Sequence, residues 1–414
     1  MADRGKNLRI DAARLWQSLM EMAQIGATAK GGVNRLALTD LDRKARQLFT
    51  RWCEDAGCTV SHDAMGNIFA RRPGRDDTLP PVVTGSHLDS QPTGGKYDGA
   101  YGVLAGLEVV RALNDADFQT EAPIEIVVWT NEEGSRFAPA MVGSGTFAGV
   151  FALADSLAIT DADGLTMGQE LARIGYDGKG CGGREIGAYF EAHIEQGPIL
   201  EAAGKPVGVV TGAQGQRWYE INLTGQESHA GPTPMAVRRD ALVGAAAIVL
   251  AVNRIGHEFQ PGACATTGMI VSRPNSRNVI PGAVFLTVDL RHPDDERLAA
   301  MDKALRDAAK AAADANGLEL AMEQIWSFDA TSFDTQCVAA VRGAAQDAGL
   351  AHMDIVSGAG HDAIYMAGVA PAAMIFVPCK DGISHNEIES ATPEDIAAGG
   401  QVLLQAMLER AGGS

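Results

Sequence analysis

The hydrophobic pattern divides the first half of the chain into helix-type and strand-type segments. Apolar residues spaced three and four positions apart predict helices over 7–30 and 40–56. Shorter apolar runs between turn residues predict strands at Thr59–Ser61, Ile68–Arg71, Val82–Thr84 and Ile124–Thr130, with a helix at Gly102–Asn114. Alternating strands and helices indicate an α/β layer, and the continuous run IEIVVW suits a strand covered on both faces.

From about residue 205 the pattern changes, and the predicted order becomes β-α-β-β-α-β. After a connecting strand at Val207–Val210, these elements are Arg217–Thr224, Asp240–Ile255, Thr266–Ser272, Val284–Arg291, Asp294–Asn316 and Leu318–Trp326. This is the split βαβ, ferredoxin-like arrangement. Residues 329–414 then return to helix, strand and helix. We therefore expect an α/β, mixed-sheet domain built from 1–214 and 329–414, with an α+β domain of 215–328 inserted into it.

Composition narrows the class of protein. The 414 residues suit two or three domains, and a net charge of −18 excludes a nucleic-acid partner, which would need a basic face. No apolar run reaches the ~18 residues of a membrane span, and the start lacks the apolar stretch of a secretory signal. The six scattered cysteines form no C-x-x-C pair, which favours reduced thiols and a cytoplasmic protein.

Four polar clusters stand at predicted strand ends, where α/β sheets form their ligand crevice. They are GSHLDSQPTGGKYDG with His87, Asp89 and Asp98, WTNEEG with Glu132 and Glu133, EAHIEQGP with His193 and Gln196, and GISHNE with His385. Three histidines with several carboxylates are the ligand set of a zinc-type site. One carboxylate can bridge two ions, and such pairs activate water.

Each feature alone also has a structural interpretation. A single histidine is usually structural, a Glu-Glu pair is usually solvated, and glycines can serve turns alone. The recurrence of the clusters at strand ends favours a metal hydrolase. In that interpretation, one of Glu132 and Glu133 binds metal and the other is the base. Asp89, two residues after His87, would orient its imidazole.

Longer motifs carry a family resemblance. They are GSHLDSQPTGGKYDGAYGVLAGLEVV, TNEEGSRFAPAMVGSG, HIEQGPILE, GQESHAGPTPM, PNSRNVIPG followed by VDLRHP, SGAGHDA and ISHNE. Over about residues 15–410 the chain resembles the amidase/hydantoinase–carbamoylase branch of the dinuclear zinc aminoacylase and carboxypeptidase superfamily. Its nearest likeness there is to N-carbamoyl-L-amino-acid hydrolases and β-ureidopropionases. The resemblance implies a metal-binding catalytic domain and an inserted lid and dimerisation domain.

The resemblance also implies the metal ligands. His87 and His193 would bind one divalent ion, His385 and Glu133 the other, and Asp98 would bridge them. Zinc is expected, although manganese, cobalt or nickel suit the same ligands. Glu132 would be the general base, and the peptide bond from Asp98 to Gly99 is expected to be cis.

The substrate contacts follow in the same way. His229 would stabilise the oxyanion, and in this family such a histidine often comes from the other subunit of a homodimer. Asn278 and Arg291 would hold the substrate carboxylate, although they could also be a surface pair. Gln196, Gly358 and Gly360 would line the pocket. His361 is interpreted as a structural residue or as one that supports a metal ligand, and Trp218 and Tyr219 are interpreted as core residues.

The activity implied is hydrolysis of the ureido group of N-carbamoyl-L-amino acids or N-carbamoyl-β-alanine. The products would be the amino acid, ammonia and carbon dioxide, from water activated by the metals and Glu132. Allantoate amidohydrolase is the main alternative, and an aminoacylase or dipeptidase is a weaker one. A non-catalytic binding protein is the alternative from another class, and the full set of ligands with Glu132 counts against it.

Overall fold

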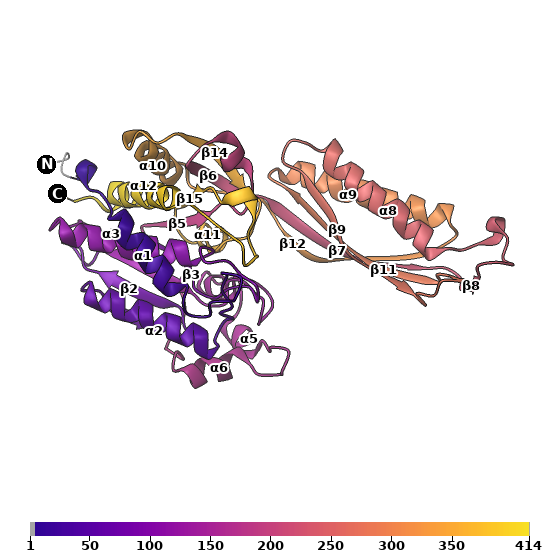
Figure 1. Cartoon of the computed structure of the whole chain (residues 1–414), viewed down its shortest axis with the longest axis horizontal. Coiled ribbons are helices and arrows are strands. Elements are labelled where there is room, and N and C mark those ends of the chain that lie inside the picture. The colour runs from indigo at the N-terminus through magenta and orange to yellow at the C-terminus, as the bar shows by residue number, and fades with distance from the viewer. Residues whose placement is uncertain (1–4, 414) are drawn as a thin grey trace. The chain divides into compact units, whose positions relative to one another are not determined.

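A computed structural model describes residues 5–413. The chain divides into two compact units (Figure 1), which are described separately: unit 1 comprises Met1–Gly212 and Ser332–Ser414, and unit 2 comprises Ala213–Thr331. The sequence pattern placed these boundaries at 214/215 and 328/329. The first four residues and Ser414 lie outside the described residues. The segment that was predicted to lack a secretory signal begins in those first four residues.

Unit 1 is built on a mixed sheet of nine strands. Its order is β1-β2-β4-β3-β5-β15-β6-β13, with β14 paired to β6. The strands are β1 (Thr59–His62), β2 (Ile68–Arg72), β3 (Val82–His87), β4 (Ile124–Trp129), β5 (Ala188–Ile194), β6 (Val207–Ala213), β13 (Thr331–Ser332), β14 (His352–Ser357) and β15 (Ala372–Val377). The four neighbours β4, β3, β5 and β15 run parallel, so their carboxyl ends meet at one edge.

Helices cover this sheet because its central strands are apolar on both faces. All residues of β3, β4, β5 and β15 are buried. The helices of unit 1 are α1 (Ala12–Met22), α2 (Asp40–Asp55), α3 (Ala100–Asp115), α4 (Val142–Phe147), α5 (Leu153–Ala158), α6 (Met167–Ile174), α7 (Ile199–Ala203), α10 (Thr335–Asp347), α11 (Asp362–Met366) and α12 (Pro393–Ala411). Helix α3 lies so close to the sheet that a side chain at Gly102 would collide with the carbonyl oxygen of Ala192.

Unit 2 is a four-stranded antiparallel sheet with two helices on one face. The strand order is β12-β7-β11-β9, the ferredoxin-like order that the sequence pattern predicts. The elements are β7 (Gly215–Thr224), β8 (Ser228–His229), α8 (Ala241–Glu258), β9 (Cys264–Arg273), β10 (Val279–Ile280), β11 (Ala283–His292), α9 (Asp295–Ala315) and β12 (Glu319–Phe328). The predicted mixed α/β fold class is confirmed.

Helix α8 departs from one expectation. By length and hydropathy its 18 residues could cross a membrane, whereas the apolar runs of the sequence predicted no such segment. The helix packs on β9 and β11 through Ala245, Ile248, Val252 and Ile255, which are buried in the core of unit 2. Burial in unit 2 therefore accounts for one apolar face of α8, while Val243 and Leu250 are exposed.

Two predicted local features differ from the structure. The helix expected over 7–30 is confined to α1, because Asp11 caps its start and the chain turns after Met22. Tyr219 is a core residue as predicted, but the prediction for Trp218 is wrong, because its side chain is 42% exposed. Successive residues of a strand face opposite sides of the sheet, so Trp218 lies on the face without helices.

Candidate functional site

The candidate site lies at the edge where the four parallel strands of unit 1 end. His87 is the last residue of β3, and His193 is the sixth of seven residues in β5. Glu132 and Glu133 follow β4, and His385 lies in the loop after β15. Four segments that are distant in sequence therefore bring polar side chains to one place.

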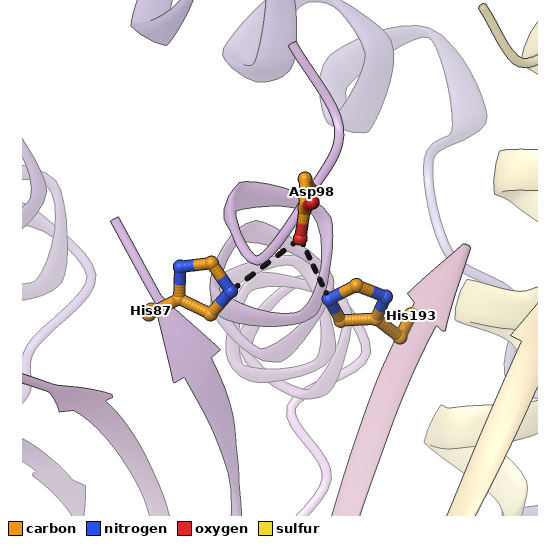
Figure 2. Close-up of side chains that lie close together, drawn as sticks. All are labelled: His87, Asp98 and His193. Carbon is orange, nitrogen blue, oxygen red and sulfur yellow. Dashed lines mark ion pairs between the residues drawn. The ribbon is translucent and has the colours of Figure 1, made fainter. Parts of the chain in front are cut away.

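Asp98 is at the centre of this cluster (Figure 2). Its Oδ1 atom lies 3.5 Å from Nε2 of His87 and 3.1 Å from Nε2 of His193. Its Oδ2 atom lies 3.3 Å from Nε2 of His385, and Oε2 of Glu133 lies 3.4 Å from that same nitrogen. Asp98 thus faces two groups of donors, one through each carboxylate oxygen.

The two buried imidazoles have a tautomer suited to a cation. Nδ1 of His87 lies 2.9 Å from the carbonyl oxygen of Asp89, and Nδ1 of His193 lies 2.9 Å from that of Ile194. A carbonyl only accepts, so these hydrogen bonds assign the ring proton to Nδ1 and leave a lone pair on Nε2. Both Nε2 atoms face Oδ1 of Asp98, and Nε2 of His193 also accepts from the backbone N–H of Gly99 over 3.1 Å. A divalent cation between the two rings and the carboxylate would bind these nitrogen and oxygen atoms. The residues present therefore fit a pair of divalent metals.

Glu132 lies beside this donor set. Its Oε2 atom is 3.4 Å from Nε2 of His87, and its side chain is buried. Burial raises the pKa of Glu132 well above its ordinary value, and the nearby Asp362 and Glu133 carboxylates add to the effect. A carboxylate with a raised pKa is a better proton acceptor, which suits a general base.

Gln91 holds both carboxylate oxygens of Glu133. The backbone N–H of Gln91 donates to Oε1 of Glu133 over 3.1 Å, and its side-chain amide donates to Oε2 over 2.6 Å. Burial, together with the charge of Asp98, raises the pKa of Glu133 to about 7. Adjacent in sequence, Glu132 and Glu133 therefore face different partners.

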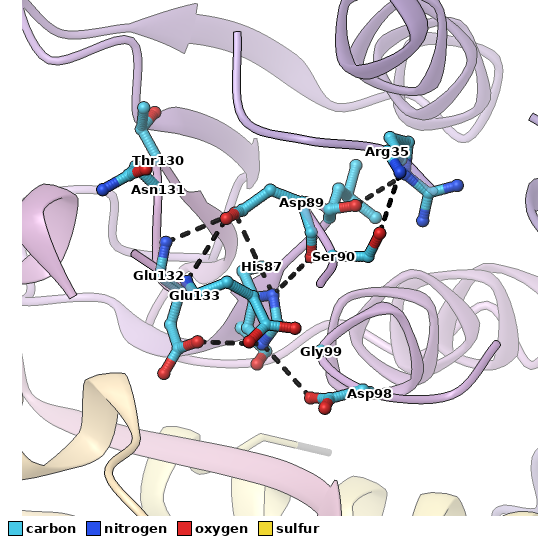
Figure 3. A network of polar contacts seen from close by, with 12 residues as sticks. Arg35, His87, Asp89, Ser90, Asp98, Gly99, Thr130, Asn131, Glu132 and Glu133 are labelled. Atoms are coloured by element: carbon cyan, nitrogen blue, oxygen red, sulfur yellow. Dashed lines mark hydrogen bonds and ion pairs between the residues drawn. The ribbon is translucent and has the colours of Figure 1, made fainter. Parts of the chain in front are cut away.

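Asp89 differs from its predicted role as the partner of the His87 imidazole (Figure 3). Its carboxylate lies 4.0 Å from Nδ1 of His87, and the backbone carbonyl of Asp89 makes the hydrogen bond instead. The carboxylate accepts from the backbone N–H groups of Glu132 and Glu133, each over 3.3 Å. Asp89 therefore holds the Glu132–Glu133 peptide in place.

Sequence reasoning missed Glu389, which acts on Asp98 in a similar way. Its buried Oε1 accepts from the backbone N–H groups of Tyr97 over 2.9 Å and Asp98 over 3.2 Å. Its Oε2 accepts from the hydroxyl of Ser384 over 2.7 Å. Glu389 lies four residues after His385. Its place just after the ISHNE motif was the one feature of the sequence that could have pointed to a role in the site. It links the loop of His385 to the peptide of Asp98.

The glycines of the first cluster make room for these contacts. A side chain at Gly95 would collide with the Glu389 carboxylate, and one at Gly99 would collide with the His87 imidazole. Gly99 also has a φ of 61°, which suits glycine where the chain turns into α3. The expected cis bond between Asp98 and Gly99 is wrong, because the cis peptide bonds within residues 5–413 all precede prolines.

Of the three residues predicted to line the pocket, Gln196 contacts the cluster directly. The side-chain amide of Gln196 donates to Oδ2 of Asp98 over 2.9 Å. A side chain at Gly360 would meet Met141, whose backbone N–H donates to the carbonyl of Glu132. Gly358 lies between Gly360 and the end of β14.

His361 packs against a metal-ligand candidate, which is one of the two roles that the sequence left open for it. Its ring centroid lies 4.5 Å from that of His193, and its side chain is buried. Burial and the neighbouring His193 lower the pKa of His361 well below its ordinary value. His361 is therefore neutral at physiological pH, and it forms part of the wall behind His193.

In unit 2, His229 and Asn278 lie close together at one end of the sheet. Strand β8, which holds His229, pairs with β10, and the backbone N–H of Ala230 donates to the carbonyl of Asn278 over 2.9 Å. Both residues are exposed. Nδ1 of His229 accepts from the N–H of Gly231 over 3.0 Å, which leaves the proton of a neutral ring on Nε2.

Arg291 lies at the opposite end of the same sheet. It is eight residues along β11 from Ala283, the end near His229, which corresponds to about 27 Å of extended strand. The carboxylate of Asp289 accepts from Nε and Nη2 of Arg291 over 3.0 and 2.8 Å. The structure therefore separates Arg291 from Asn278, and they are not the surface pair that the sequence left open.

Comparisons with known proteins bear on this site. Residues 83–409 match the peptidase family M20/M25/M40. The chain belongs to this family. It is a hydrolase, and its family is metal-dependent, in keeping with the donor groups around Asp98. The resemblance to hydantoinase–carbamoylase amidases is confirmed.

Individual relatives cover nearly the whole chain. An N-carbamoyl-L-amino-acid amidohydrolase of Rhizobium meliloti is 50% identical over 99% of both chains. An allantoate amidohydrolase of Bacillus subtilis is 33% identical over 94% of this chain and 95% of its own. A crystal structure of a hydantoinase/carbamoylase family amidase from Burkholderia multivorans has 65% identity and a TM-score of 0.95, covering 98% of both chains.

Proposed function

We propose that this chain hydrolyses the ureido group of N-carbamoyl-L-amino acids. The observation that carries the proposal is Glu132, a buried carboxylate with a raised pKa, beside a double donor set centred on Asp98. The 50% identity with the Rhizobium meliloti enzyme supports the substrate class. The products are the free amino acid, ammonia and carbon dioxide, and the bond broken is a C–N bond other than a peptide bond.

The metal ligands are proposed as follows. His87 and His193 would hold one divalent ion, Glu133 and His385 would hold the other, and Asp98 would serve both, in keeping with its two separate groups of neighbours. When bound, such ions polarise the scissile carbonyl and lower the pKa of water. Zinc is the proposed metal, because imidazole and carboxylate suit it, and manganese, cobalt and nickel are tested beside it.

Glu132 is the proposed general base and acid. Its buried carboxylate takes the proton of the attacking water and later gives it to the leaving amine. Asp89 holds the backbone of Glu132 in place by accepting hydrogen bonds from the N–H groups of Glu132 and Glu133. Gln196, Gly358 and Gly360 line the space beside it.

The substrate-binding roles of unit 2 need two copies of the chain. His229, with its proton on Nε2, suits stabilisation of an oxyanion, and Asn278 lies beside it. Arg291 suits bidentate binding of a carboxylate. Because about 27 Å of strand separates these two ends, one unit 2 cannot bring both to a single ureido acid. The proposed homodimer supplies the two ends from different subunits.

The proposed dimer contact is strand β9 together with helix α8. Strand β9 forms an edge of the sheet of unit 2, and its Met269, Ile270 and Val271 are 40–52% exposed. On α8, Leu250 is 73% exposed. An exposed apolar edge strand is a template for pairing with another chain, and antiparallel pairing of two β9 strands satisfies two-fold symmetry. The location proposed is the cytoplasm, which suits six unpaired cysteines.

A substrate panel tests the proposed activity. The purified chain is loaded separately with zinc, manganese, cobalt or nickel and assayed for ammonia release. The substrates are several N-carbamoyl-L-amino acids, N-carbamoyl-β-alanine and allantoate, the last because of the Bacillus subtilis relative. We expect the highest kcat/KM with N-carbamoyl-L-amino acids. A preference for allantoate, or no ammonia from any ureido acid with any metal, would refute the proposal.

A further inference from the structure

A buried arginine of unit 1, Arg35, lies against the loop that follows His87. Its side chain is only 3% exposed. Nε of Arg35 donates to the backbone carbonyl of Leu88 over 2.6 Å. Nη1 donates to the carbonyls of Met22 over 3.2 Å and Ile25 over 2.8 Å, at the end of α1. Within residues 5–413 these acceptors are backbone carbonyls, and no carboxylate forms an ion pair with the guanidinium.

The charge of Arg35 is costly to bury in this way. Burial lowers the pKa of Arg35 to about 10, and the neighbouring Asp42 and Asp89 carboxylates oppose the shift. The guanidinium therefore stays charged at neutral pH. A buried charge without an ion pair costs free energy unless its hydrogen bonds compensate. An apolar side chain could fill the same space at lower cost, so the contacts with the carbonyls are what distinguishes arginine here.

Arg35 holds the loop on both sides of Asp89 (Figure 3). Its side chain holds the carbonyl of Leu88, and its backbone exchanges two hydrogen bonds with Ser90. The N–H of Arg35 donates to the Ser90 hydroxyl over 2.8 Å, and the carbonyl of Arg35 accepts from the N–H of Ser90 over 2.9 Å. Leu88 and Ser90 flank Asp89, so the backbone of Asp89 is fixed between two contacts.

Asp89 in turn contacts three residues of the candidate site. Its carbonyl lies 2.9 Å from Nδ1 of His87, and its carboxylate accepts from the backbone N–H groups of Glu132 and Glu133. Groups that hydrogen-bond to metal ligands in this way orient them and tune their affinity for the metal. A displacement of the Asp89 backbone would therefore change the orientation of the imidazole and of the Glu132–Glu133 peptide together.

The residues just before Arg35 pack against two loops of the site. Val33 and Gly94 exchange two backbone hydrogen bonds, over 2.9 and 3.0 Å. A side chain at Gly32 would collide with the carbonyl oxygen of Gly94 and with the backbone of Glu387 in the ISHNE motif. The chain that leads into Arg35 is thus held close to the loop of Asp98 and to the loop of the last predicted ligand.

We propose that Arg35 is a positioning residue for the metal ligands. It holds the loop from Leu88 to Ser90 so that His87 presents Nε2 to the cation. Arginine suits this role because its planar fork donates to several acceptors at once, which lysine does not. Arg35 lies outside residues 83–409, the part of the chain that matches the family. The inference rests on the proposed role of His87 as a metal ligand.

The test compares Arg35→Met with Arg72→Met. Arg72 is the matched control, because it is also buried and also donates to a backbone carbonyl, that of Phe118 over 2.8 Å. Zinc affinity is measured by competition with a chelator. Arg35→Met should weaken zinc binding about ten- to a hundredfold, the usual effect of removing a group that supports a metal ligand. Arg72→Met should lower Tm and keep the wild-type zinc affinity.

Two further measurements separate positioning from general stability. Arg35→Lys keeps the charge and a donor group, so it should bind zinc more tightly than Arg35→Met. In the metal-free protein, backbone hydrogen exchange over residues 86–98 should be faster in Arg35→Met than in the wild type. The same segment should exchange at the wild-type rate in Arg72→Met.

The outcomes distinguish this inference from the proposed function. Wild-type zinc affinity in Arg35→Met would overturn the inference, and so would an equal loss of affinity in Arg72→Met. If Arg35→Met does not fold, Arg35→Lys and Arg72→Lys replace the pair, and equal zinc affinity in these two would overturn it. If the wild type binds no zinc, the proposed metal ligands fail. Hydrogen exchange in the metal-free protein then decides the role of Arg35, and an unchanged rate in Arg35→Met or Arg35→Lys rejects it.

Discussion

At the scale of single residues, Glu132 and Glu133 are adjacent carboxylates with different surroundings. Glu132 faces His87, whereas Glu133 is held by Gln91 and lies near His385. We expect Glu132→Gln to retain both metals and to lower kcat about a hundred- to ten-thousand-fold, because only the base is removed. Glu133→Gln, the matched variant, should lose metal. Metal analysis and ammonia release check both, and near-normal kcat in Glu132→Gln would exclude it as the base.

Glu389 is the residue that shapes the loop of Asp98. Its Oε1 accepts two backbone N–H groups, and an amide oxygen can accept the same two bonds. Glu389→Ala should therefore weaken metal binding at least tenfold and lower Tm, since unsatisfied buried groups cost about 1–3 kcal/mol. Glu389→Gln should retain most of the affinity. Glu387→Ala, which removes a hydrogen bond with Thr28 and an ion pair with Lys30, is the control for a chelator-competition titration. Equal loss in the Ala and Gln variants would contradict the role in peptide positioning.

Arg291 is expected to discriminate by charge. Ion-paired hydrogen bonds contribute about 1.5–3 kcal/mol, so Arg291→Ala should lower kcat/KM about ten- to a hundredfold for an N-carbamoyl amino acid. The corresponding amide, which has no carboxylate, should lose far less. Steady-state kinetics on the acid and its amide measure the difference. Equal losses for both would show that Arg291 does not bind the carboxylate.

At the scale of elements, local pattern predicted the strands and the residues that follow them. The apolar runs of β3 and β4 are continuous in sequence, so His87, Glu132 and Glu133 could be placed at strand ends. The contact of Glu389 with Tyr97 joins residues 292 positions apart, and no local pattern encodes it. The pattern of the sequence also gave no sign of the bulge in β12. Gln324 pairs with Tyr219 but Trp326 pairs with Trp218, so one extra residue changes which face Trp326 occupies without changing the apolar composition of the strand.

The two edge strands of unit 2 provide a matched pair for testing the dimer contact. Ile270 on β9 and Ile325 on β12 are 48% and 46% exposed. A lysine on an edge strand opposes pairing with another chain, so Ile270→Lys should convert the dimer to a monomer. Ile325→Lys should leave the dimer intact. Light scattering after size-exclusion chromatography measures the mass, and a dimer that survives Ile270→Lys but not Ile325→Lys would move the contact to β12.

At the scale of the whole molecule, the length of β11 bears on whether one substrate-binding site takes its residues from two subunits. His229 and Arg291 lie at opposite ends of the sheet, so the two ends must serve different substrates or come from different copies. Mixed dimers of His229→Ala and Glu132→Gln subunits would then hold one site with both defects and one with neither. We expect about half of wild-type activity per mixed dimer, although each parent is nearly inactive. Tandem affinity purification on two tags isolates the mixed species for assay. If verified mixed dimers stay as inactive as their parents, His229 acts within its own subunit, and the cross-subunit site is wrong.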